Sequence, residues 1–191
     1  LLYGIALVYG ATGATQFAVI GERIAGYGLL GNTMLLVGTG LLTVGLGFKV
    51  AAVPFHMWAP DVYDGAPTPI TAFMAAAVKA AAFAAFARIW YECFQMTIDT
   101  WAPALWWIAV VTMVVGNLIA LQQQNLKRML AYSSIVHSGY LIVAVLANSA
   151  LGSAAFVFYV LAYTLATFGA FGVLSAVQRG ADRPPMMADV A

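Results

Sequence analysis

Six long apolar stretches dominate this sequence, and each is long enough to cross a bilayer. Hydropathy places them at approximately 1–20, 29–60, 69–91, 103–121, 129–147 and 153–177. A transmembrane helix needs about 20 apolar residues, and a span in lipid must satisfy its own backbone hydrogen bonds. We therefore expect an all-α fold, a polytopic transmembrane helical bundle with six spans in a single transmembrane domain over 1–191.

The composition excludes a water-soluble domain. Hydrophobic residues make up 63% of the chain and charged residues 8%, whereas soluble domains carry about a quarter charged residues. The net charge of +1 gives no footprint for nucleic acid. The single cysteine, Cys93, allows neither an internal disulfide nor a Cys/His metal site. The lipid bilayer is the expected surrounding.

The two ends of the chain suggest a piece of a longer protein. Leu1 lies inside an apolar stretch, and the last residues form a polar segment with Pro184 and Pro185. The beginning lacks the basic region and the cleavage site of a signal peptide. We therefore expect a fragment of a longer membrane subunit.

Lys79 lies near the middle of the third stretch, where an ammonium group is costly. Between Ile70 and Tyr91 the only other formal charge is Arg88, and at ~1.5 Å per residue Lys79 lies ~15 Å into a core of ~30 Å. A central lysine costs roughly 2.5–3.5 kcal/mol and usually faces a bundle interior or water on an ion or proton path. The alternative is a lysine that snorkels to the interface, but its stem of about 6 Å is too short. Lys79 is therefore predicted to carry protons.

The second stretch is too long for one straight helix, since its 32 residues would span ~48 Å. Pro54 has no N–H, and its ring clashes with the carbonyl of Val50, so we expect the helix to break near Pro54. Lys49 lies beside this break at a depth similar to that of Lys79. Broken helices in transporters line wet cavities and ion sites. Lys49 is thus a second candidate proton carrier, with an interfacial position as the alternative.

His137 lies about eight residues into the fifth stretch and adds a third titratable group to this middle layer. Hydroxyl side chains occur near it or at helical spacing on the sixth stretch: Ser133, Ser134, Tyr140, Tyr159, Tyr163, Thr164 and Thr167. These hydroxyls could hold ordered water, so His137 is predicted to extend a proton relay. A core histidine bonded to Ser133, one turn earlier, is the alternative.

A lysine that carries protons must release one in each cycle. Dry surroundings or a second ammonium nearby favour the neutral amine, so Lys49 and Lys79 are expected to influence each other. A charge that crosses 100 mV needs ~2.3 kcal/mol, and the sequence has no nucleotide-binding motif to supply it. The energy is expected to come from a partner.

Basic residues predict the orientation. The side of the membrane that holds the loop 61–68, here called the loop side, also holds Lys127, Arg128, Arg179 and Arg183, whereas Arg23 and Arg88 lie on the opposite side. Positively charged loops usually stay in the cytoplasm. The loop side is therefore predicted to be cytoplasmic.

The stretch from Phe48 to Pro69, FKVAAVPFHMWAPDVYDGAPTP, closely resembles the antiporter-like membrane subunits of respiratory complex I, and within that family the subunit N branch. The similarity continues through Thr71–Met74, Val78–Phe83 and Asn125–Tyr140. These motifs are long and specific, and the resemblance extends over nearly the whole chain.

This resemblance implies that the chain corresponds to helices six to eleven of a subunit with fourteen helices. It places the lysine of the family's broken seventh helix at Lys49 and the lysine of the eighth helix at Lys79. The glutamate of helix five, which pairs with the first lysine, and the lysine of helix twelve belong to parts outside this chain.

The resemblance also implies a function. It indicates a proton-translocating membrane subunit of NADH:quinone oxidoreductase, multi-pass in a bacterial plasma membrane and bound to other membrane subunits of complex I. NADH, flavin, iron–sulfur clusters and quinone would belong to partner subunits, with no cofactor in this chain. An Mrp-type cation/proton antiporter subunit and a structural membrane spacer are the alternatives.

Overall fold

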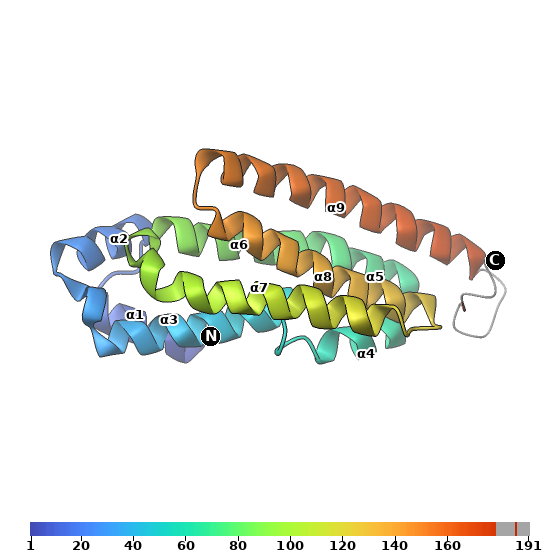
Figure 1. The fold of residues 1–191 in the computed structure, drawn as a ribbon, viewed down its shortest axis with the longest axis horizontal. Helices are drawn as coiled ribbons and strands as arrows, with labels where there is room; N and C mark the ends of the chain where they lie inside the picture. Colours follow the sequence, from blue (N-terminus) through green and yellow to red (C-terminus); the bar gives the residue numbers. More distant parts are fainter. Residues whose placement is uncertain (179–185, 187–191) are drawn as a thin grey trace.

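The computed structural model describes residues 1–178 and 186, and most of these residues lie in helices (Figure 1). The α-helices of this part are α1 (Leu2–Thr12), α2 (Phe17–Gly26), α3 (Thr33–Val50), α4 (Trp58–Gly65), α5 (Thr68–Phe73), α6 (Lys79–Glu92), α7 (Ile98–Ala120), α8 (Leu126–Leu146) and α9 (Ala150–Val177). The predicted all-α transmembrane bundle is confirmed. Arg179, Arg183, Pro184 and Pro185 lie outside the described residues.

The membrane spans follow the predicted stretches with one difference. Five helical segments are long and apolar enough to cross a membrane: Thr33–Val50, Thr68–Glu92, Gln95–Ala120, Leu126–Leu146 and Ala150–Val177. The first predicted stretch is not one straight helix, because α1 and α2 meet at an angle of 50°. Together these two helices are long and apolar enough to form a sixth span.

Gly13 explains why the first stretch bends. Its φ of 65° is a left-handed conformation that glycine adopts without the penalty of a Cβ. The Arg23 guanidinium donates to the carbonyl of Thr12 at 2.8 Å, which satisfies a carbonyl at the end of α1. The bend is therefore an ordered turn that is stabilised by its own hydrogen bonds.

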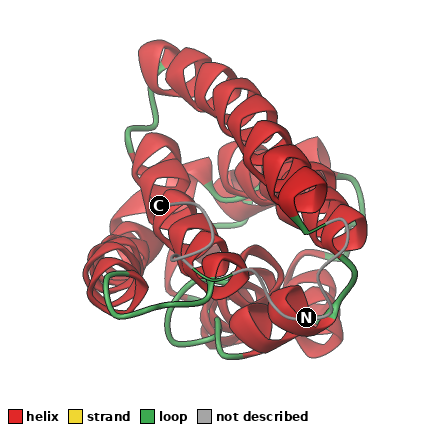
Figure 2. Ribbon diagram, turned by 90° about the vertical axis from the view of Figure 1, so that its right-hand side faces the viewer, coloured by secondary structure: helices red, strands yellow, loops and turns green. Residues whose placement is uncertain are grey.

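The spans run along the long axis of the bundle, with α9 at one side (Figure 1). The view along that axis shows the helices joined by short loops (Figure 2). α7 and α8 approach closely at Gly139, where an added Cβ would lie 3.1 Å from the backbone oxygen of Ala109. Small residues at such crossings let membrane helices pack against each other.

The predicted break near Pro54 is present between α3 and α4. α3 ends at Val50, where Ala51 has a φ of 57° and the Ala52 N–H donates to the carbonyl of Gly47 at 2.9 Å. This pattern is a left-handed helix end, uncommon at a residue with a Cβ. The helix thus ends four residues before Pro54, so the clash between Pro54 and the Val50 carbonyl never arises.

A π-helical turn interrupts the third predicted stretch. It covers Met74–Val78, between α5 and α6, and ends directly before Lys79. Such turns leave the regular hydrogen-bond pattern and often occur at functional sites. The turn therefore sets which way the first residues of α6 point.

Candidate functional site

Lys79 is buried inside the bundle and held by neutral oxygens. Its side chain is 3% exposed. The ammonium donates to the Ser134 carbonyl oxygen at 2.7 Å and to Ser134 Oγ at 2.5 Å. Within residues 1–178 and 186, no carboxylate forms an ion pair with it. The snorkelling alternative does not match this buried position.

Ser134 continues the chain of polar groups from α6 to α9. The hydroxyl of Tyr163 lies 2.9 Å from Ser134 Oγ and 3.1 Å from the carbonyl oxygen of Ala75, which belongs to the π-helical turn. Ser134 is 2% exposed and Tyr163 is 7% exposed. Ser134 Oγ accepts from both Lys79 and Tyr163 in this arrangement. Because a hydroxyl can also donate, the chain can carry a proton between Lys79 and Tyr163 once the Ser134 hydroxyl turns.

His137 lies next to this chain and contacts the aromatic side chains of α9. Its Nδ1 is 2.6 Å from the Tyr159 hydroxyl, and its ring centroid is 4.9 Å from that of Tyr163. The histidine is thus bonded to the next helix and not to Ser133, the partner in the alternative interpretation. Thr164 is not part of the contact, because its buried hydroxyl has no hydrogen-bond partner in the described part.

A cavity of about 320 Å³ opens beside His137 between α8 and α9. We call it the His137 cavity; its polar lining is formed by Ser133, His137, Tyr159, Tyr163 and Thr167. It has room for several water molecules, which need polar partners of this kind. The structure thus brings together Lys79, His137 and most of the hydroxyls that the sequence indicated.

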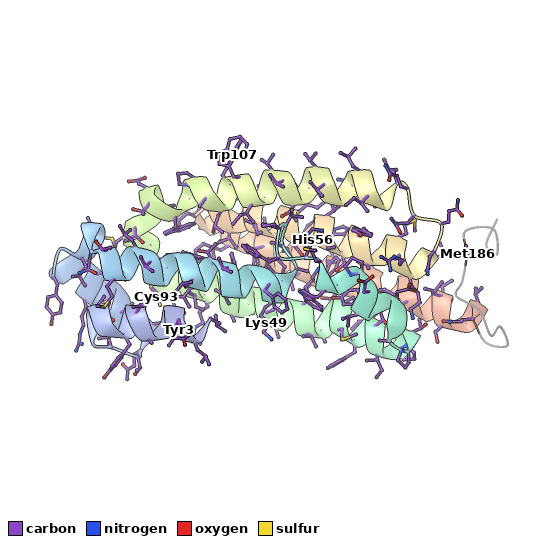
Figure 3. All side chains as sticks on the ribbon, turned by 90° about the horizontal axis from the view of Figure 1, so that it is seen from below. Tyr3, Lys49, His56, Cys93, Trp107 and Met186 are labelled. Carbon is purple, nitrogen blue, oxygen red and sulfur yellow. The ribbon has the colours of Figure 1, made fainter. Side chains whose placement is uncertain are left out.

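Lys49 is placed differently. It lies in the last turn of α3, next to the break, and is exposed on the surface of the bundle (Figure 3). Among the described residues, no hydrogen bond or ion pair joins it to Lys79 or to any other side chain. The two lysines therefore do not form a direct pair in this part of the chain.

Two buried hydroxyls, which the sequence did not single out, form hydrogen bonds with backbone groups in the break. Ser138 Oγ donates to the Val50 carbonyl at 2.7 Å, and the Val53 N–H donates to Thr112 Oγ1 at 3.0 Å. Ser138 is four residues after Ser134, so the helical spacing alone puts both hydroxyls on one face of α8. No such spacing in the sequence points to Thr112, because only the packing of α7 against the break brings its hydroxyl close to Val53.

The Thr112 hydroxyl is expected to contribute to stability. Thr112→Val leaves the Val53 N–H buried without an acceptor, at a cost of about 1–3 kcal/mol. Thermal unfolding of the full-length subunit in its complex measures the loss as a lower Tm. Thr43→Val is the matched control, because among the described residues the Thr43 hydroxyl bonds only to the Thr39 carbonyl in its own helix. Equal Tm values for the two variants would contradict this role.

Polar contacts also join α4 to the start of α8 on the loop side. Arg128 forms an ion pair with Asp61 at 2.8 Å and a longer one with Asp64 at 3.7 Å. The Lys127 ammonium donates to the carbonyl oxygens of Asp64 at 2.8 Å and Ala66 at 2.6 Å. These bonds satisfy carbonyls at the end of α4 and fix it against α8.

The fold and the site define a class of protein: a multi-pass membrane protein with a broken helix and ionisable groups inside its bundle, the features of ion- and proton-transfer proteins. The chain belongs to the NADH:quinone oxidoreductase/Mrp antiporter membrane family, whose model matches residues 1–188.

Relatives of known identity agree with this family. The chain is 56% identical over 191 residues to NADH-quinone oxidoreductase subunit N of Gemmatimonas aurantiaca, covering 36% of that protein. It is 51% identical over 181 residues, 95% of the chain, to subunit N of Mycobacterium tuberculosis, covering 34% of it. The chain thus spans about a third of the length of these curated relatives.

Solved structures show the same fold. The chain resembles a chain of respiratory complex I from Thermus thermophilus with a TM-score of 0.70 and 46% identity, covering 91% of this chain and 36% of that one. It resembles a chain of the Mrp complex from Dietzia with a TM-score of 0.83 and 25% identity, covering 93% and 32%.

Proposed function

We propose that this chain is the central part of a subunit N-type protein that translocates protons in NADH:quinone oxidoreductase of a bacterial plasma membrane. Its partners are other membrane subunits of complex I. Partner subunits hold the flavin, the iron–sulfur clusters and the quinone site, oxidise NADH and supply the energy. The single observation that carries this proposal is the buried Lys79 ammonium, bonded to Ser134 and through it to Tyr163.

The neutral surroundings of Lys79 suit reversible proton release. When a buried ion pair loses one charge, the other charge remains uncompensated, and this is strongly unfavourable. Ser134 and Tyr163 carry no charge, so the amine can become neutral without leaving a carboxylate alone. The proton passes along Ser134 Oγ and the Tyr163 hydroxyl towards the His137 cavity. The imidazole of His137, whose Nδ1 lies 2.6 Å from the Tyr159 hydroxyl, receives it there.

A role in proton transfer is also proposed for Lys49 and for the break between α3 and α4. Lys49 acts as a second carrier, and the rest of the subunit completes its surroundings. The residues around Pro54 form the non-helical backbone of the break. Because Ser138 and Thr112 already bond to the backbone of Val50 and Val53, the break can be kept inside the bundle at low cost.

Removal of the Ser134 hydroxyl tests the relay. Within the described part of the chain, Ser134→Ala leaves Lys79 bonded only to the backbone carbonyl of residue 134 and disconnects Tyr163. NADH-driven proton translocation is therefore expected to fall about three- to tenfold. The measurement is acidification by the assembled complex in proteoliposomes. Thr43→Ala serves as a control, because it removes a hydroxyl that bonds within α3. Unchanged translocation by Ser134→Ala would refute the relay.

An Mrp-type cation/proton antiporter is the second candidate, since the family model and the Dietzia structure include that class. The two functions differ in what drives transport. The proposed function predicts that proton movement requires NADH and quinone and does not depend on sodium. Sodium-driven proton exchange without the redox partners would instead favour the antiporter.

A further inference from the structure

A second cavity lies on the loop side of the bundle, in line with the His137 cavity. It measures about 530 Å³ and is lined by Asp64, Thr68, Pro69, Lys127, Ser175 and Gln178, among others. We call it the loop-side cavity. The Thr68 hydroxyl donates to Gln178 Oε1 at 2.5 Å across it. The ends of α5, α8 and α9 that form it lie together at the right of Figure 1.

The two cavities lie one after the other along α8 and α9. On α9 the lining passes from Phe171 of the His137 cavity to Ser175 of the loop-side cavity, and on α8 from Leu130 to Lys127. These steps are four and three residues, or ~6 Å and ~4.5 Å along a helix. About one helical turn therefore separates the two cavities.

Apolar side chains and the ring of Tyr63 fill that turn. One buried cluster contains Tyr63, Ala72, Ala75, Ala131, Phe171 and Leu174. Phe171 is 2% exposed and Leu174 is 5% exposed, and both come from α9. Leu126 and Leu130 of α8 pack against the cluster. Polar groups thus lie on both sides of a short apolar section, which we call the apolar plug.

We propose that Phe171 and Leu174 form a hydrophobic gate between the loop-side cavity and the proton-transfer site at Lys79 and His137. An apolar constriction excludes water and blocks ions until it becomes wet. A proton crosses between the site and the loop side, in either direction, only when water enters the plug. This inference rests on the proposed function and adds the route of access to it.

The gate explains how the site avoids a leak. A continuous water file from the loop side to Lys79 would let protons equilibrate without driving any transport. A section only one turn thick can be wetted by a small shift of α9, which lies at one side of the bundle (Figure 1) and contacts α5 and α8. Opening and closing of the plug would then couple access to the state of the site.

The test uses the assembled complex with variants in the full-length subunit, reconstituted in proteoliposomes without NADH. Phe171→Gln places a polar side chain in the plug and is expected to speed the decay of an imposed pH gradient about tenfold. Phe171→Tyr adds one hydroxyl at nearly the same volume and is expected to give a smaller increase. Phe168→Gln and Phe168→Tyr are the matched controls, because Phe168 lies one turn earlier on α9 and is 42% exposed.

The outcomes separate the gate from the proposed function. A faster decay with the Phe171 variants, reversed when Lys79→Met is added, supports a gate that leads to Lys79. A decay equal to that of the Phe168 controls for both Phe171 variants overturns the gate. A leak that persists in the double variant also overturns it, because the route would bypass Lys79. Failure of the proposed function appears elsewhere, as normal NADH-driven translocation with Lys79→Met alone.

Discussion

Replacement of Lys79 by methionine is expected to reduce NADH-driven proton translocation at least about tenfold, since a positioned proton carrier contributes effects of this size or larger. Methionine has a similar length and no charge, so it fills the space and removes only the titratable group. An ammonium without a carboxylate partner is costly to bury, and an apolar side chain at this position removes that desolvation cost. We therefore expect the complex to assemble normally while transport is lost.

Arg88→Met provides the control for this experiment. Arg88 lies on the same helix, nine residues after Lys79, and forms an exposed ion pair with Glu92. Acidification by proteoliposomes and the amount of assembled complex are measured for both variants. If Lys79→Met translocates protons as well as Arg88→Met does, the chain is a structural spacer and the proton-carrier interpretation is wrong.

Lys49→Arg is expected to impair translocation as strongly as Lys49→Ala, again about tenfold. Arginine keeps a positive charge at the end of α3, where it interacts favourably with the helix dipole. A guanidinium does not release its proton in a protein. A residue that only neutralises the helix end would tolerate arginine, whereas a proton carrier would not. The exposed position of Lys49 on this part of the chain predicts little change in folding for either variant.

The comparison of the two Lys49 variants contains its own control. Both are measured for NADH-driven acidification and for thermal stability of the assembled complex. Normal translocation by Lys49→Arg together with a defect in Lys49→Ala would assign Lys49 an electrostatic role at the end of α3. Normal translocation by both variants would remove Lys49 from the proton path.

The spans could be predicted because each one depends on the hydropathy of its own residues. A run of apolar residues that can cross a bilayer has to form a helix, whatever its neighbours are, so the stretches that became α7, α8 and α9 were located within a few residues. The first stretch was the exception. Its apolar character falls over residues 12–16, but only the backbone conformation at Gly13 and the bond from Arg23 show the bend.

The candidate site was predictable only in part. The cost of an ammonium in lipid pointed to Lys79 before any fold was known. Its partner Ser134 was one hydroxyl among several, and its bond to Lys79 arises because α6 and α8 meet at that level. The break was predicted near Pro54 from the proline alone, but the actual helix end depends on Ala51 and on the bond from Ser138 to Val50.

The sequence by itself determined that this chain lies in a membrane, which segments are helical and which lysine is costly there. These properties depend on hydropathy and on residues close together along the chain. The tertiary structure decided that Lys79 bonds to Ser134, which also bonds to Tyr163, that Lys49 is exposed, and that Phe171 is buried beside the His137 cavity. Such properties depend on which faces of distant helices meet. In these spans apolar residues surround each helix, so the sequence does not show which face will contact a neighbouring helix.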